Sequence, residues 1–157
     1  MIDSRMPMRA GIDRLDEITE NTIMNDMDSV IHKLKELSKK GVYIAIDDFG
    51  TGYSSLSYLS RFPLDTLKID RSFVKELPAS QTDISLIKIM MLMARELNLE
   101  VIAEGVETAA QLAFLRRLQC DQFQGYLFSK PLAADDAGQH IERNYNGQMS
   151  LYARLWP

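Results

Sequence analysis

The stretch YIAIDDFGTGYSSLSYL, residues 43–59, places an apolar run directly before two adjacent aspartates and a glycine-containing turn. The run VYIAI at 42–46 is β-branched and aromatic, which predicts a strand. Asp47 and Asp48 follow it, and Gly50 can take backbone angles that other residues avoid. Burying two neighbouring like charges costs free energy unless other groups compensate them. The stretch therefore predicts a buried strand that ends in a polar site, and it raises the question of what compensates the aspartates.

The same alternation of strand and helix continues on both sides of this stretch. Strands are predicted at 14–19, 42–46, 65–69 and 100–104, and a last strand with its loop at 122–128. Helices are predicted at 27–41, 55–62, 82–97 and 108–119, with a short terminal helix after 129–136. Strands that alternate with helices are typical of parallel sheets with helical crossovers. The pattern predicts an α/β fold with about five parallel strands.

Composition and charge narrow the classes of protein to which the chain can belong. The 157 residues are 46% hydrophobic and 25% charged, which is typical of one soluble globular domain. The net charge of −4 offers no basic surface for DNA. No apolar run reaches the roughly 18 residues that cross a bilayer. Cys120 is the single cysteine, and a chain without disulfides is typical of the cytoplasm. We therefore expect a cytoplasmic protein with no DNA partner and no membrane segment.

Polar residues recur where the predicted strands end. They are Glu17, Asp47, Asp48, Lys68, Asp70, Glu104 and Gln124. In a parallel α/β domain the carboxyl ends of all strands lie on one face, so these side chains should converge there. Clustered carboxylates repel one another, and hard divalent cations are the usual remedy. Because His32 and His140 are far apart in the sequence, oxygen ligands for Mg²⁺, Mn²⁺ or Ca²⁺ are favoured over a zinc site.

Each of these residues also has a purely structural interpretation. Asp47 can form a turn or cap a helix. Glu104 and Glu107 flank Gly105 before a helix, and acidic residues favour a helix N-terminus. Glu17 lies in a strand whose apolar pattern is interrupted. The recurrence of polar residues at successive strand ends, rather than any single residue, favours an active-site face.

Three longer motifs resemble one known family. They are IAIDDFGTGYSSLSYLSRFPLDTLKIDRSFV, VIAEGVET and QGYLFSKPL, and they are similar in order and spacing to the EAL domain of bacterial cyclic di-GMP phosphodiesterases. The resemblance implies a variant of the TIM barrel. It also implies that Mg²⁺ or Mn²⁺ takes part in cutting one phosphodiester bond of cyclic di-GMP, which yields the linear dinucleotide pGpG.

The resemblance also implies roles for individual residues. Glu17, Asp47 and Asp48 match the family's metal ligands, with Asp48 serving a second ion. Lys68 matches the lysine that holds the attacking water or a phosphate oxygen. Glu104 matches the glutamate that acts as general base or as a ligand of the second metal.

Five further positions match supporting or substrate-binding residues of the same motifs. They are Glu20, Asp70, Glu107, Gln124 and Pro131. Glu20 resembles the glutamate that anchors the DDFGTGYSS loop. In the family this loop, with the helix after it, forms a common dimer contact.

The chain also departs from the family pattern. It contains no Glu-Ala-Leu or Glu-Val-Leu tripeptide upstream of Glu17, so the namesake glutamate and an asparagine ligand are absent. A complete barrel needs about 250 residues. We therefore expect a partial barrel, with a truncated EAL domain at 11–143 between an N-terminal lead at 1–10 and a tail at 144–157.

An incomplete site and an open barrel lead to two further expectations. As this chain alone, the phosphodiesterase should be impaired or inactive. The alternative is a non-catalytic module that binds cyclic di-GMP or another protein. Open barrel edges, or the loop and helix at 47–60, should make the chain a homodimer or a larger oligomer.

Overall fold

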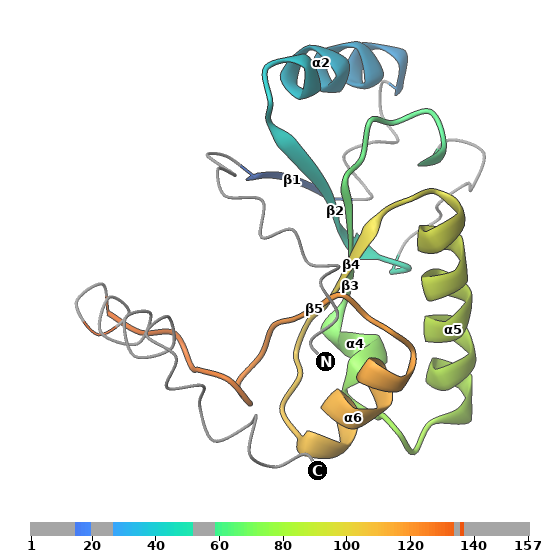
Figure 1. Cartoon of the computed structure of the whole chain (residues 1–157), viewed down its shortest axis with the longest axis vertical. Coiled ribbons are helices and arrows are strands. Elements are labelled where there is room, and N and C mark those ends of the chain that lie inside the picture. The colour runs from blue at the N-terminus through green and yellow to red at the C-terminus, as the bar shows by residue number, and fades with distance from the viewer. Residues whose placement is uncertain (1–14, 20–26, 52–58, 134–135, 137–157) are drawn as a thin grey trace, which may run out of the picture.

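A computed structural model of the chain describes residues 15–19, 27–51, 59–133 and 136. Its centre is one parallel sheet in which the strands follow one another in sequence order (Figure 1). The strands are β1 (Leu15–Thr19), β2 (Tyr43–Phe49), β3 (Thr66–Ile69), β4 (Glu100–Ala103) and β5 (Gln122–Phe123). Each strand is parallel to its neighbour. The predicted α/β class with five parallel strands is confirmed.

In the described part of the chain, four helices lie between the strands in sequence. They are α2 (Met27–Lys39), α4 (Arg71–Val74), α5 (Gln81–Glu96) and α6 (Ala109–Arg117). Capping residues determine where two of them begin. Ser80 accepts a hydrogen bond from the amide of Asp83 at the start of α5, and Thr108 forms a capping box with Gln111 at the start of α6. None of the helices in these residues is long and apolar enough to cross a membrane.

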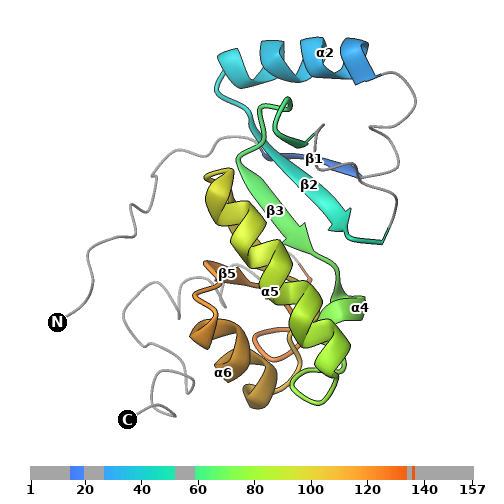
Figure 2. The same cartoon turned by 90° about the vertical axis from the view of Figure 1, so that its right-hand side faces the viewer.

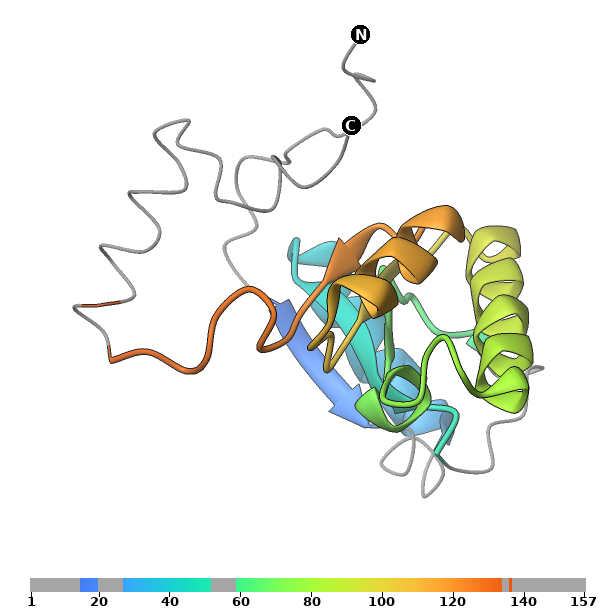
Figure 3. The same ribbon diagram turned by 90° about the horizontal axis from the view of Figure 1, so that it is seen from below.

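The hydrophobic core lies between the sheet and the helices that run along it. Figure 2 shows α5 lying across the sheet in front of β3, and Figure 3 shows α5 and α6 side by side when the molecule is viewed from below. Every residue of β3 is buried, and Ile87 and Ala94 of α5 are fully buried against the sheet side of the core. Burial on both faces of a parallel sheet explains why these strands read as continuous apolar runs.

Two aspartates tie the beginnings of neighbouring strands together. The side chain of Asp65, just before β3, accepts a hydrogen bond of 2.9 Å from the amide of Ile44 near the start of β2. The side chain of Asp121, just before β5, accepts one of 2.9 Å from the amide of Val101 in β4. The same device therefore appears twice and helps to set the register of two strand pairs. Sequence reasoning did not identify either residue.

The observed elements differ from the predicted ones at three places. β2 continues through both aspartates to Phe49. A bulge after Ile46 shifts the register, and Phe49 then pairs with Ile69 of β3. In the stretch 122–128, expected to hold a strand and a loop, the strand β5 is only two residues long and the loop includes a turn at 126–128. α4 was not predicted, since its four residues carry no helical periodicity. The predicted helix at 55–62, apart from its end, and the terminal helix and tail lie outside the described residues.

Candidate active site

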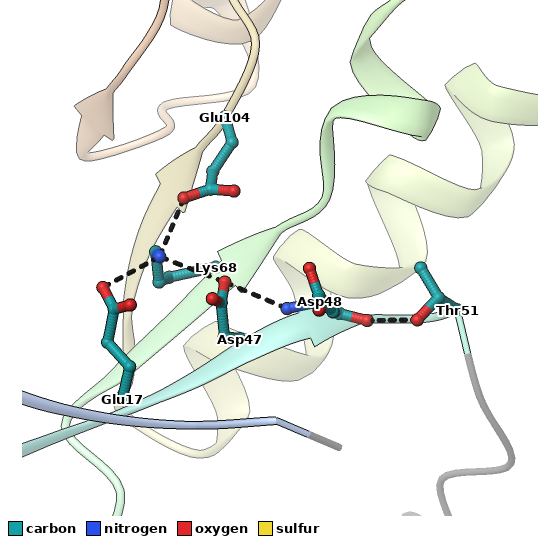
Figure 4. A network of polar contacts seen from close by, with 6 residues as sticks. All are labelled: Glu17, Asp47, Asp48, Thr51, Lys68 and Glu104. Carbon is teal, nitrogen blue, oxygen red and sulfur yellow. Dashed lines mark hydrogen bonds and ion pairs between the residues drawn. The ribbon is translucent and has the colours of Figure 1, made fainter. Parts of the chain in front are cut away.

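Lys68 is the centre of the polar site. Its ammonium nitrogen Nζ lies 2.9 Å from Oε1 of Glu17, 3.0 Å from Oδ1 of Asp47 and 2.8 Å from Oε1 of Glu104. The three carboxylates come from β1, β2 and the end of β4, and in Figure 4 they converge on the ammonium group of β3. The Lys68 side chain is 7% exposed, whereas that of Glu17 is 46% exposed. The site is therefore a buried cation beneath a ring of carboxylates that reaches solvent on one side.

The alternation of side chains along each strand brings these groups together. Lys68 lies between Leu67 and Ile69, which are fully buried in the hydrophobic core. Successive residues of a strand point to opposite faces, so Lys68 projects from the face opposite to theirs. Lys68 pairs with Ile102 in the register of β3 and β4. Glu104, two residues beyond Ile102, therefore projects from the same face as the ammonium group.

The carboxylates control the protonation of Lys68. Burial by itself lowers the pKa of a lysine because it disfavours the charged form. Hydrogen bonds from the ammonium group to Glu104, Glu17 and Asp47 outweigh this effect, and the net result is a raised pKa of Lys68. Lys68 is thus held as a cation among the three carboxyl groups.

Asp48 lies beside this cluster rather than in it. Its backbone adopts a positive φ of 54°, a region that few residues other than glycine enter. Its amide donates a 3.0 Å hydrogen bond to Oδ1 of Asp47, and its carbonyl accepts one of 2.8 Å from the hydroxyl of Thr51 (Figure 4). No ion pair joins the carboxylate of Asp48 to another described residue. The structure therefore groups Glu17 and Asp47 on Lys68 and leaves Asp48 at the margin.

The supporting residues suggested by the sequence are placed in several different ways. Asp70 caps α4 and accepts a 2.9 Å hydrogen bond from the amide of Ser72. Burial raises the pKa of Asp70, but the bonds from Ser72 outweigh it and the net pKa is lowered. Glu107, Gln124 and Pro131 are exposed. Glu20 lies outside the described residues.

The loop between β4 and α6, which begins with Glu104, is held by backbone contacts. The Val106 amide donates a 3.0 Å hydrogen bond to the carbonyl of Gln124, and the Val106 carbonyl accepts one of 3.0 Å from Leu127. A Cβ on Gly125 would lie 2.3 Å from the nitrogen and oxygen of Val106, so only glycine permits this close approach. The QGY motif thus supports the loop of Glu104, and the side chain of Gln124 need not take part.

The donor atoms at this site suit a hard divalent cation, because they are carboxylate oxygens and the net charge is negative. Their arrangement is closed around a different cation. In residues 15–19, 27–51, 59–133 and 136, no group of three histidine, cysteine, aspartate or glutamate side chains is arranged to hold a metal ion. Glu17, Asp47 and Glu104 each direct an oxygen at Lys68. A metal would therefore bind the remaining carboxylate oxygens or displace the ammonium group from some of its partners.

The amino-acid sequence of this chain is similar to those of known proteins. A family model of the EAL domain matches residues 16–131. The cyclic di-GMP phosphodiesterase NbdA of Pseudomonas aeruginosa is 55% identical over 116 residues, which are 74% of this chain and 15% of NbdA. The chain thus spans less than a fifth of this relative.

Solved structures give the same result for the fold. The PaMucR phosphodiesterase in complex with c-di-GMP is 48% identical, with a TM-score of 0.75 over 78% of this chain and 50% of that one. BlrP1 from Klebsiella pneumoniae, in its complex with manganese and cyclic di-GMP, is 38% identical, with a TM-score of 0.69 over 74% of this chain and 30% of that one. BlrP1 has also been solved with calcium and cyclic di-GMP.

Proposed function

The chain belongs to the EAL domain family, and from this premise we propose that it is a cyclic di-GMP phosphodiesterase domain that works with a divalent metal ion. Relatives named as phosphodiesterases, and solved relatives that hold cyclic di-GMP, support the substrate. The manganese and calcium complexes of a relative support a divalent ion, and we propose Mg²⁺ or Mn²⁺ for this chain. The proposed domain extends over 11–143, which encloses the matched residues 16–131.

One observation carries this proposal: three carboxylates from three strands meet on the ammonium group of Lys68. We assign Glu17 and Asp47 as metal ligands, with Asp48 beside them for a second ion. A bound divalent ion lowers the pKa of water and neutralises charge on a phosphoryl group. Lys68 is a fixed positive charge that would bind a phosphate oxygen of the substrate. We assign Glu104, 19% exposed, as the group that accepts a proton from an attacking water, at the carboxylate oxygen that does not contact Lys68.

We propose that this chain alone is an impaired catalyst. The carboxylates that would bind a metal ion already form ion pairs with Lys68, so an ion must compete with a buried ammonium group for them. Metal-ligand sets that need rearrangement bind weakly, because the rearrangement reduces the net binding free energy. The alternative function is a module that binds cyclic di-GMP without cleaving it. A phosphate oxygen would then have to displace a carboxylate from Lys68, because the three N–H donors of its ammonium group face Glu17, Asp47 and Glu104.

The test is to incubate the purified chain with cyclic di-GMP and Mn²⁺ while both binding and the linear product are measured. We expect binding with little turnover. Asp47→Asn should weaken Mn²⁺-dependent binding, whereas Asp28→Asn, which changes an exposed aspartate paired with Arg61, should not. Rapid turnover that Asp47→Asn abolishes would show that the chain is a full enzyme. Absence of binding to the dinucleotide would contradict the proposal altogether.

We also propose a cytoplasmic location, because the substrate is a bacterial signalling nucleotide and Cys120 is the single cysteine. A homodimer or larger oligomer is proposed as the working form. It is supported by three exposed apolar side chains on α5, since exposed apolar area favours self-association. They are Leu86, Ile89 and Leu92, at 37%, 62% and 61% exposure.

A further inference from the structure

Gln111 makes more hydrogen bonds than any single role in helix capping requires. The side chain is buried, with 4% of the residue exposed. Its Oε1 accepts bonds from the amides of Glu107 at 2.8 Å and Thr108 at 2.9 Å. Its Nε2 donates to the carbonyls of Val74 at 3.2 Å and Lys75 at 3.1 Å. All four hydrogen-bonding positions of the amide group are therefore used.

These bonds join the two chain segments that carry opposite ends of an ion pair. Val74 ends α4, the single helical turn that follows Lys68 at a distance of a few residues. Glu107 lies three residues after Glu104, in the loop between β4 and α6. Gln111 lies on a third element, α6. Its side chain thus connects α4, which follows Lys68, to the loop that follows Glu104.

A second contact acts between the same two segments. Gly105 has a positive φ of 68°, and a Cβ at this position would lie 2.5 Å from Cβ of Arg71, the first residue of α4. The loop after Glu104 is therefore packed against the start of α4 and hydrogen-bonded, through Gln111, to its end. Between these contacts the position of Glu104 relative to Lys68 has little freedom.

We propose that Gln111 is a positioning residue, which holds the loop of Glu104 against α4 and so sets the 2.8 Å contact between Glu104 and Lys68. The inference rests on the proposed function, in which these two groups act on the substrate. Gln111 touches neither of them and acts through the backbone of its neighbours.

The two halves of the Gln111 amide can be separated by substitution. A glutamate completes a capping box as well as glutamine does, so Gln111→Glu retains the acceptor for the amides of Glu107 and Thr108. A carboxyl group has at most one donor, so at least one bond to the carbonyls of α4 is lost. Thr108→Val is the matched control, because it removes the capping bond from the amide of Gln111 and leaves the bonds to α4 in place.

The experiment follows the side-chain ammonium of Lys68 by ¹H–¹⁵N NMR in the full chain, with no metal and no nucleotide. Lys68 is the buried lysine of the described residues, so its ammonium protons should exchange slowly enough to be seen. Glu104→Ala supplies the reference for a lost contact, because it removes the acceptor oxygen. We expect Gln111→Glu to shift the signal toward that reference and to speed proton exchange roughly fivefold, which is the effect of losing about one hydrogen bond. Thr108→Val should lower thermal stability and leave the signal at its wild-type position.

An unchanged Lys68 signal in Gln111→Glu would overturn the proposal and reduce Gln111 to a helix cap. If that variant does not fold, the Glu104 side is changed and the hydrogen bonds of Gln111 are measured, because coupling between two sites is reciprocal. In Glu104→Ala, which removes the acceptor oxygen, the amides of Glu107 and Thr108 should then exchange faster than in the wild type, and unchanged protection would overturn the proposal. Neither arm uses activity, so a failure here is distinct from a failure of the phosphodiesterase assignment.

Discussion

The ammonium group of Lys68 and the carboxylate of Glu104 are 2.8 Å apart, although 35 residues separate them along the chain. The two side chains project from the same face of neighbouring strands, diagonally across the register of β3 and β4. Two more carboxylates complete the surroundings of the ammonium group. The buried lysine therefore compensates part of the acidic charge of Glu17, Asp47 and Glu104, and it makes no ion pair with Asp48 among the described residues.

Replacing Lys68 by methionine should destabilise the fold and increase its response to metal ions. The remaining carboxylates repel one another, and we expect the free energy of unfolding to fall by about 2 kcal/mol, less than for a fully buried pair because Glu17 is half-exposed. Mn²⁺ should then raise the melting temperature of Lys68→Met more than that of the wild type, since it can take the place of the ammonium group. Lys75→Met, at an exposed position, is the control. Equal responses to Mn²⁺ in all three proteins would contradict a carboxylate metal site.

Substitutions at Asp48 should separate backbone strain from metal binding. Its φ of 54° suits glycine better than any side chain. Asp48→Gly should leave the stability in denaturant unchanged or raise it by up to about 1 kcal/mol, whereas Asp48→Val should lower it by about 1–2 kcal/mol. If Asp48 serves a second ion, both variants should lose the same part of the Mn²⁺ affinity. A destabilised Asp48→Gly variant would show that the aspartate side chain, not its backbone angle, matters for folding.

Gly105 and Gly41 form a matched pair for testing the packing of the loop of Glu104. Both have positive φ angles, 68° and 81°, but a Cβ on Gly41 has nothing within 4 Å, while one on Gly105 would lie 2.5 Å from Cβ of Arg71. Gly41→Ala should cost about 1 kcal/mol from backbone strain alone. Gly105→Ala should cost about 1–3 kcal/mol more, because the contact is overpacked. Equal losses in chemical denaturation would show that the loop can move away from α4 without penalty.

The buried thiol of Cys120 should make stability depend on alkaline pH. Burial raises the pKa of this thiol from 9.0 to about 11, and the thiol contacts the carbonyls of Val101 and Gln122. The unfolded chain releases the thiol proton first as the pH rises, so stability is fully present below pH 9.0 and is lost as the pH rises toward 11. The loss should be about 2–3 kcal/mol.

Denaturant unfolding of the wild type and of Cys120→Ala across this pH range checks the expectation. Other groups titrate in both proteins, so the difference between the two slopes is the relevant quantity. Parallel slopes would exclude a contribution from Cys120. Below pH 8, a thiol reagent should label the folded wild type only at the rate at which it opens.

The oligomeric state should respond to the exposed apolar face of α5. Light scattering should show a dimer or a larger species for the wild type. Ile89→Lys, which places a charge at a position that is 62% exposed, should shift the population toward the monomer. Lys88→Ala changes a neighbouring exposed residue and should not. A monodisperse, folded wild-type monomer would rule out the proposed assembly.

Much of the fold followed from local patterns in the chain. The runs that became β2, β3 and β4 are apolar and β-branched, and the helices between them have apolar residues at helical spacing. Such patterns report burial directly, because a parallel sheet covered on its faces excludes polar side chains. The helix α4 was missed, and the end of β5 within its stretch of strand and loop was not predicted, since two to four residues are too few for any periodicity to show.

The candidate site was predictable in its members and less so in its connections. Glu17, Asp47, Lys68 and Glu104 were expected to converge because the carboxyl ends of parallel strands meet on one face, and the structure brings all four together. Gln111 was missed, because a glutamine in a helix start looks like an ordinary cap until its distant partners are known. Sequence patterns also placed Asp48 with Asp47, whereas of these two carboxylates only that of Asp47 forms an ion pair with Lys68 in the described residues.

The order of strands and helices, the face on which the acidic residues lie and the family of the chain all follow from the amino-acid sequence alone. These features depend on residues that are close together in the sequence, or on motifs that are contiguous in it. Two features become visible only in the folded chain: three carboxylates share the ammonium group of Lys68, and Gln111 connects the loop of Glu104 to α4. Such contacts join residues tens of positions apart, and their geometry depends on strand register, a bulge and close backbone packing, none of which is encoded by local pattern.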